Sequence, residues 1–184
     1  ERHWQVQRAM ATERWTGSWY TIFLTIDRAG GLAVDPAFEI EIRRPLERYR
    51  MAGHDIEVDG PRFVWLEVEL RVCVLPEYYR GDVRRELLEA FSSGVRPDGR
   101  RGFFHPDNFT FNQPVYLSRI YAVAQEAPGV RFVEALTFQR FGDARSSALD
   151  SGELAIGRLE IARLDNDPSF PERGVLRLTM EGGR

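Results

Sequence analysis

Residues 64–74 read Val-Trp-Leu-Glu-Val-Glu-Leu-Arg-Val-Cys-Val, and this stretch decides how the rest of the chain is arranged. Aliphatic residues occupy every even position, while the odd positions carry charged, aromatic or thiol side chains. Because side chains alternate between the two faces of a strand, the pattern predicts one long, half-buried β-strand. The turn signal Asp59-Gly60-Pro61 precedes it. We predict two domains, an N-terminal α+β unit at residues 1–60 and a C-terminal α+β unit at residues 61–184.

The N-terminal unit begins with a predicted β-hairpin. Residues 6–12 and residues 20–26 both alternate with period two, and Trp15-Thr16-Gly17-Ser18 interrupts the alternation. Two alternating runs separated by a short polar segment with a glycine are typical of two strands joined by a turn.

A helix is predicted after the hairpin. Asp35 and Pro36 suit the N-cap and first position of a helix, and apolar residues then recur at helical spacing. Pro45 lies inside that run and lacks a backbone donor, so we expect a kink or a break near Ile42. A short segment at residues 54–58 completes the order ββαβ.

The C-terminal unit continues from the long strand with helices and then strands. The predicted elements, in chain order, are a helix opening at Gly81-Asp82, a helix with Pro114 at its first position, a strand around residues 132–138, a mobile loop at residues 142–152, and strands at residues 159–164 and 175–180. This order is βααβ with a β-rich tail. The expected fold class is α+β, as two small antiparallel-sheet units with helices on one face.

Between the two helices of this unit lies a long aromatic loop, at about residues 95–113. Residues 102–119, which overlap it, hold five aromatic residues and two prolines, and they cannot form one regular element. A loop this apolar must rest on something. Either it folds back on its own domain or it is an interface, and the sequence leaves both readings open.

Tryptophan gives a second hint of contact surfaces. Trp15 and Trp19 flank the hairpin turn, and Trp65 lies on the charged face of the long strand. Such residues either cover a small core or anchor an interface, since Trp is enriched at binding hot spots. The candidate assembly interface consists of aromatic and adjoining residues: Trp15, Trp19, Trp65, Phe103, Phe104, His105, Phe109, Phe111, Tyr116 and Arg119.

Composition excludes several classes of function. The net charge of −3 and a pI near 5.7 lack the basic footprint of a nucleic-acid-binding domain. No apolar run is long enough for a membrane span. The single Cys73 rules out an internal disulfide framework. Because the chain starts at Glu1 with no signal pattern, we expect it to be a piece of a longer polypeptide.

No catalytic or cofactor motif is present. The three histidines are far apart and have no ligand at metal-binding spacing, and Gly30-Gly31 lacks the further glycines of a phosphate loop. Asp165-Asn166-Asp167 looks like half a calcium loop, but prolines follow where a calcium loop needs glycine and glutamate. We therefore predict no catalytic residues, no metal site, no cofactor and no enzyme activity.

Five segments carry a family resemblance that covers nearly the whole chain. They are WTGSWY at residues 15–20, LERYRMAGHD at 46–55, DGRRGFFHPDNFTF at 98–111, QPVYLSR at 113–119 and GRLEIARLDNDP at 157–168. With these segments the chain resembles the C-terminal region of baseplate assembly proteins. These proteins form the J-like baseplate wedge family of contractile phage tails and extracellular contractile injection systems.

The resemblance implies a structural wedge subunit that joins neighbouring wedges into a ring around the central hub and spike. The implied partners are other copies of the chain, a second wedge subunit, the sheath-initiating baseplate protein and the hub or spike, with no nucleic acid and no membrane span. It also implies assembly in the cytoplasm and a final place in a phage-like particle. Two other readings stay open: a stand-alone α+β ligand-binding module, and an enzyme domain in which folding gathers His105, Asp107 and Ser118.

Overall fold

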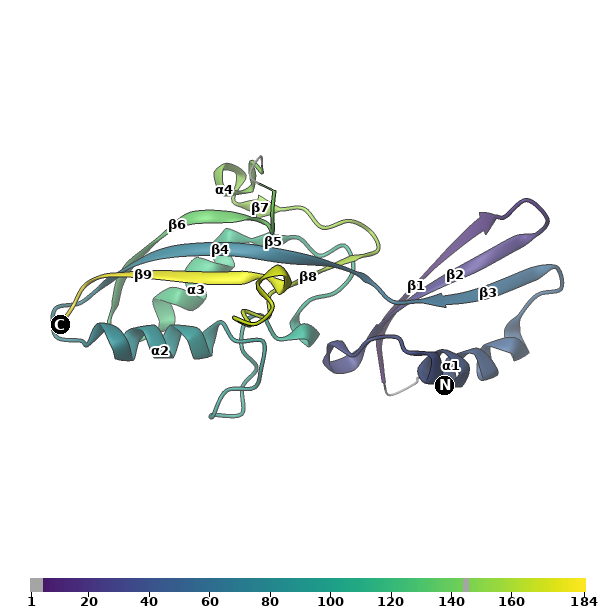
Figure 1. Ribbon diagram of the computed structural model, residues 1–184, viewed down its shortest axis with the longest axis horizontal. Helices are drawn as coiled ribbons and strands as arrows, with labels where there is room; N and C mark the ends of the chain where they lie inside the picture. Colours follow the sequence, from purple (N-terminus) through teal and green to yellow (C-terminus); the bar gives the residue numbers. More distant parts are fainter. Residues whose placement is uncertain (1–4, 144–145) are drawn as a thin grey trace. The chain divides into compact units, whose positions relative to one another are not determined.

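The computed structural model describes residues 5–143 and 146–184 (Figure 1). The chain divides into two compact units, Glu1–Arg62 and Phe63–Arg184. Both combine strands and helices, so the expected α+β class is confirmed. Each unit has its own sheet and its own buried side chains and is described by itself.

The first unit is a three-stranded sheet with one covering helix. Its strands are β1 (Val6–Trp15), β2 (Tyr20–Arg28) and β3 (His54–Asp59), with β2 in the centre. β1 is antiparallel to β2, as predicted, and Trp15 lies opposite Tyr20. β3 runs parallel to β2, which corrects the expectation of an antiparallel sheet. The helix between them carries the chain back across the sheet, and such a crossover produces a parallel pair.

That helix, α1 (Pro36–Leu46), starts where the sequence predicts. The Asp35 carboxylate accepts a hydrogen bond of 2.9 Å from a backbone N–H of the first turn. The expected break near Ile42 is wrong, because the helix continues past it and changes to a 3₁₀ turn, η2 (Glu47–Tyr49), only after Leu46. Pro45 lies in the last turn, where few helical hydrogen bonds remain to be disrupted.

The core of the first unit lies between α1 and the sheet. Its buried side chains come from β2, α1 and β3, and they are Ile26, Phe38, Ile42 and Val58. A 3₁₀ turn, η1 (Ala29–Gly31), leads from β2 toward the helix. The α1 side of the sheet is therefore its apolar face.

The second unit is built on β4 (Arg62–Val74), in which the even-numbered residues from Val64 onward are buried and the odd ones are half-buried. This is the predicted alternation. β6 (Val130–Arg140) pairs antiparallel along one edge, while β8 (Glu160–Arg163) and β9 (Val175–Gly182) pair with the other. β9 runs parallel to β4, which again differs from the expected antiparallel sheet. A long connection separates the two strands in the sequence, and such a connection allows a parallel pair.

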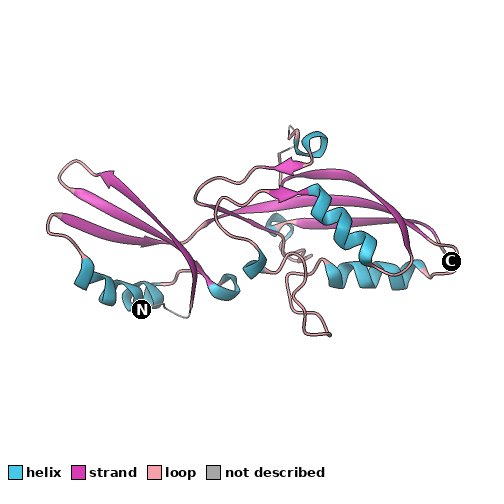
Figure 2. Ribbon diagram, turned by 180° about the vertical axis from the view of Figure 1, so that it is seen from behind, coloured by secondary structure: helices cyan, strands magenta, loops and turns pink. Residues whose placement is uncertain are grey.

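Two helices cover the apolar face of this sheet. They are α2 (Arg80–Ala90) and α3 (Leu117–Glu126), and Figures 1 and 2 show both on the same side of β4, β6 and β9. Leu87 of α2 and Ile120 of α3 are fully buried. The predicted placement of helices on one face is found in this unit, and the opposite face stays open.

α3 starts three residues later than predicted. Pro114 does not open it, because a two-residue strand, β5 (Val115–Tyr116), comes first and pairs antiparallel with β7 (Glu153–Leu154). This pairing links positions far apart in the chain, and no local pattern signals it.

The tail is richer in turns than the sequence suggests. The predicted loop at residues 142–152 contains a short helix, α4 (Ala148–Ser151), and residues 144–145 of that loop lie outside the described residues. Two 3₁₀ turns, η3 (Pro106–Asn108) and η4 (Pro171–Arg173), complete the unit. The two predicted tail strands are present as β8 and β9.

Candidate assembly surfaces

The aromatic segment folds onto its own unit. Phe103, Phe104 and Phe109 form a ring cluster with Phe91, which follows α2. The Phe103 and Phe104 centroids are 4.9 Å apart edge to face, and the Phe104 and Phe109 rings stack at 6.1 Å. Phe104, Phe109 and Phe111 are only 1%, 4% and 6% exposed. In the folded unit these three side chains are buried and cannot contact a partner. They belong to the core, which corrects their assignment to the candidate interface.

Backbone contacts hold the segment in this position. A Cβ on Gly102 would lie 2.2 Å from the carbonyl oxygen of Ser92, so only glycine permits this close approach. The Asn108 side-chain amide donates to the carbonyl oxygens of Gly102 and Phe103 at 2.8 and 3.1 Å. These contacts satisfy backbone groups that a loop would otherwise leave buried and unpaired.

His105 stabilises the local turn through a side-chain hydrogen bond. Its Nδ1 accepts a hydrogen bond of 3.2 Å from the Asp107 backbone N–H, and the Asp107 carboxylate lies 3.0 Å from the Arg101 guanidinium. Ser118 is exposed on α3 and, within the described residues, has no hydrogen bond to His105 or Asp107. The catalytic reading of these three residues receives no support from their geometry.

Two residues of the segment stay at the surface. Tyr116 is 43% exposed on β5. Arg119, on the first turn of α3, is exposed and places its guanidinium 5.7 Å from the Phe103 ring centroid. Phe103 itself is half-buried beneath that cation. A partner could reach Tyr116 and Arg119, but the phenylalanine cluster lies below them.

Trp65 is part of a small aromatic cluster on the open face of the long strand. Its ring lies 5.9 Å from that of Phe63, and the Arg163 guanidinium lies 4.4 Å from Phe63 and 5.8 Å from Trp65. The half-buried indole is thus already in contact with a cation of its own unit.

Polar pairs cover the rest of this open face. The Glu67 carboxylate accepts hydrogen bonds from the Arg177 guanidinium at 2.7 Å and from the Gln139 amide at 2.8 Å. These two bonds, the Arg177 bond first, lower the pKa of Glu67 below its ordinary value. Charges that already pair with one another make a solvated face rather than an assembly surface.

The turn between β1 and β2 holds a different aromatic group, fully available to a partner. We call Trp15, Trp19 and Tyr20 the hairpin tip; they are 58%, 52% and 46% exposed. The Trp15 and Tyr20 rings meet edge to face at 5.2 Å, and Tyr20 stacks on His54 at 5.8 Å. His54 Nε2 in turn lies 3.2 Å from a carboxylate oxygen of Glu13. These contacts hold the rings of Trp15 and Tyr20 against each other and against His54.

Local sequence explains why the rings gather there. The Thr16 N–H and hydroxyl both donate to the Trp19 carbonyl oxygen, at 3.0 and 2.9 Å. Gly17 has φ of +102°, a conformation that other residues rarely adopt. The tight turn therefore places Trp15 beside Tyr20, and Trp19 is its last residue before β2.

The sequence did not single out every exposed large side chain of the first unit. Tyr20 was assigned to the strand, although its place directly across the turn from Trp15 could have identified it. Tyr49 and Met51 are 76% and 59% exposed on the connection between α1 and β3. The sequence gives no signal of this exposure, which follows only from the packing in the fold.

Metal and membrane sites find no support in the described part of the chain. Residues 5–143 and 146–184 contain no group of three His, Cys, Asp or Glu side chains that could hold a metal ion. None of the helices there is long and apolar enough to cross a membrane.

Comparison with known protein families finds a match for the first unit. Residues 1–59 match the family described as the Baseplate J-like central domain. This is the family that the sequence resembles, although the matched region is its central domain rather than its C-terminal region. No curated protein matches the chain.

Among solved structures, the chain is similar to part of the cryo-EM structure of the anti-feeding prophage (AFP) baseplate, 6-fold symmetrised. The sequence identity is 11% and the TM-score is 0.44. The similarity covers 94% of this chain and 39% of that chain. The chain thus spans about two fifths of the protein it matches.

Proposed function

From the match of residues 1–59 to the baseplate J-like central domain, we propose that the chain belongs to the baseplate J-like family and is a structural wedge subunit of a contractile tail-like injection particle. Its role is to join neighbouring wedges into a ring around the central hub and spike. Such a role needs stable protein contacts and no active site.

The proposed partners are other copies of the chain, a second wedge subunit, the sheath-initiating baseplate protein and the hub or spike. Assembly takes place in the cytoplasm, and the chain then stays in the particle. The proposal includes no catalysis, and neither nucleic acid nor a membrane takes part in binding.

One observation carries the choice of contact surface. The unit that matches the family exposes Trp15, Trp19 and Tyr20 together at one end of its sheet, and the rings of Trp15 and Tyr20 are in contact. Aromatic rings exposed by a monomer but fixed in place lose little entropy on binding, and Trp and Tyr are the commonest interface anchors. The hairpin tip is therefore the proposed assembly contact of the first unit.

Particle assembly tests this proposal. The double substitution Trp15→Ser and Trp19→Ser should remove anchors worth about 2 kcal/mol or more of binding free energy. Baseplates isolated from cells that express the variant should lack closed rings in electron micrographs. The thermal unfolding of the purified chain should change little, since both side chains are exposed.

The matched control is Phe132→Ser, which removes an aromatic ring that is 47% exposed on β6. The control should assemble normally. Normal rings from the double variant would contradict the assignment of the hairpin tip, and a large loss of unfolding free energy in that variant would show that the tip is structural.

A further inference from the structure

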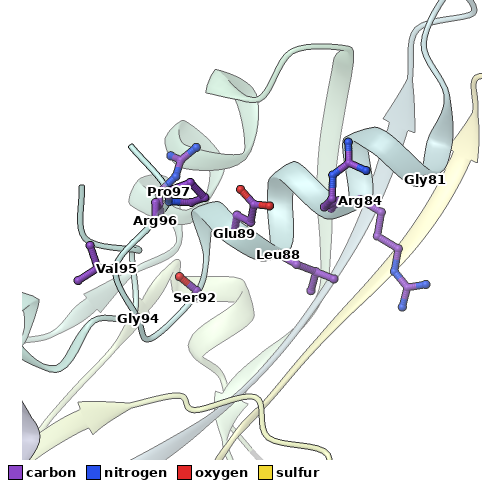
Figure 3. Close-up of a pocket in the computed structure, with 10 residues that line it drawn as sticks. Gly81, Arg84, Leu88, Glu89, Ser92, Gly94, Val95, Arg96 and Pro97 are labelled. Atoms are coloured by element: carbon purple, nitrogen blue, oxygen red, sulfur yellow. The ribbon is translucent and has the colours of Figure 1, made fainter. Parts of the chain in front are cut away.

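The second unit has a groove beside α2 that is open to solvent. The outer side of α2 forms one wall and residues 92–97 form the other, around a space of about 620 Å³ (Figure 3). Leu88 and Val95, which line it, are 37% and 62% exposed, and Pro97 adds further apolar surface. An apolar floor in solvent contact is typical of a binding surface.

Basic side chains border this groove. Arg96 pairs with Glu86 at 2.6 Å, and Arg85 pairs with Asp82 at 2.9 Å. Arg84 has no ion pair within residues 5–143 and 146–184. With Arg85 and Arg96 already paired, Arg84 is the lining arginine that can meet a negative charge of an apolar partner, and the Glu89 carboxylate also lines the groove.

The hairpin tip has this chemistry. Its rings project from a turn, and the neighbouring Glu13 carboxylate, 57% exposed, has the His54 ring as its partner rather than an arginine. Of the other cations near the tip, Arg50 is already shared between Glu47 at 2.9 Å and Asp55 at 3.9 Å, and Arg14 places its guanidinium 5.2 Å from the Phe23 ring centroid. Glu13 is thus the carboxylate beside the rings that no arginine neutralises among the described pairs.

We propose that the hairpin tip of one copy docks into the α2 groove of a second copy, with Glu13 facing Arg84. This inference rests on the proposed function, because it names the copy-to-copy contact of the ring. The tip belongs to the first unit and the groove to the second, so each copy donates a tip and receives one. A contact between two different surfaces of identical chains is head to tail, and it generates a ring when the rotation closes.

Charge reversal tests the contact on the whole purified chain. Glu13→Arg and Arg84→Glu should each weaken self-association by roughly tenfold or more, because like charges then face each other across the contact. Sedimentation velocity over a concentration series measures the change. Combining both substitutions in one chain restores the opposite charges and should recover most of the wild-type association. Circular dichroism of each variant confirms that it is folded.

A mixing experiment separates this contact from other modes of association. A copy with Trp15→Ser and Trp19→Ser keeps its groove, whereas a copy with Arg84→Glu keeps its tip. Neither should associate alone, and the mixture should give heterodimers and nothing larger. A contact that pairs identical surfaces would not give this pattern.

Two results would overturn the inference. One is that Arg84→Glu leaves self-association unchanged. The other is that the chain with both charge reversals associates no more tightly than the chains with a single reversal. The proposed function is separable from both. If the tip variant loses ring assembly while Arg84→Glu assembles normally, the tip contacts another baseplate protein and the wedge role stands.

Discussion

At the residue scale, burial decides which members of the aromatic set can act at an interface. Phe104 and Phe109 have the same chemistry as the exposed rings, yet they are almost fully buried beside Phe91. Trp15 and Trp19 expose more than half of their surface. Because a large ring releases free energy wherever it is removed from water, the same residue type serves a core in one place and a partner in another.

The carboxylate of Glu67 gives a prediction about pH. Arg177 and Gln139 lower its pKa in the folded chain, so it releases its proton more readily when folded than when unfolded. It therefore stabilises the fold above the unfolded-state pKa of about 4.3, and this stabilisation is lost as the pH falls through the folded-state pKa. Glu67→Gln should unfold at a lower temperature than the wild type at pH 7.

The gap between the two melting temperatures should narrow steadily below about pH 4. Thermal unfolding followed by circular dichroism measures this difference in melting temperature. The pH range, about 3 to 7, covers the titration of the carboxylate. Glu134 pairs with Arg71 on the same face, and an exposed ion pair contributes little to stability. Glu134→Gln is therefore the control. A gap for Glu67→Gln that stays constant with pH would refute the role assigned to its ionised form.

At the element scale, the aromatic loop is a packed part of the second unit. Gly102 lets the chain pass against Ser92, the Asn108 amide closes the turn, and the phenylalanines fill the space beyond α2. The hairpin turn, also rich in aromatics, leaves about half of the surface of Trp15, Trp19 and Tyr20 exposed. The two segments differ in what packs against them rather than in composition.

This difference predicts opposite outcomes for two similar substitutions. Phe109→Ser should lower the free energy of unfolding by roughly 3–5 kcal/mol, because it leaves a cavity and buries a hydroxyl. Trp19→Ser should change it by about 0.5 kcal/mol or less, since the indole is exposed. Urea denaturation of the two purified variants provides the comparison. A small loss for Phe109→Ser would return the aromatic loop to the list of candidate interfaces.

At the scale of the whole molecule, the chain consists of two units with separate cores. The buried apolar residues of the first unit, among them Ile26 and Ile42, belong to one cluster around α1. The second unit buries its own set beneath β4 and its two helices. A chain of two compact units can present a different surface from each of them.

If the two cores are separate, a substitution in one core should destabilise only the unit that contains it. Ile26→Ala should cost roughly 2–5 kcal/mol in the first unit. Hydrogen exchange should then accelerate in β1, β2 and β3, while the amides of β4 and α3 keep their protection. Leu70→Ala, in the buried face of β4, is the reciprocal variant. Faster exchange in both units from either substitution would show one cooperative core instead of two.

Local patterns account for much of this fold. The alternation in β4, the hairpin of β1 and β2, and the start of α1 at Asp35 follow from side chains that are neighbours in the sequence. The parallel pairings of β3 and β9 do not, because strand direction depends on connections that no single segment encodes. The short pairing of β5 with β7 was missed for the same reason.

The sequence by itself determined the fold class, the principal elements of both units and the resemblance to the baseplate J-like family, since periodicity and family motifs are carried by neighbouring residues. Only the tertiary structure decided which aromatics are free. It buried Phe104, Phe109 and Phe111, left Trp15, Trp19 and Tyr20 exposed, and formed the groove beside α2. Whether a ring is covered depends on side chains brought together from distant positions, so composition cannot separate a core ring from an exposed one.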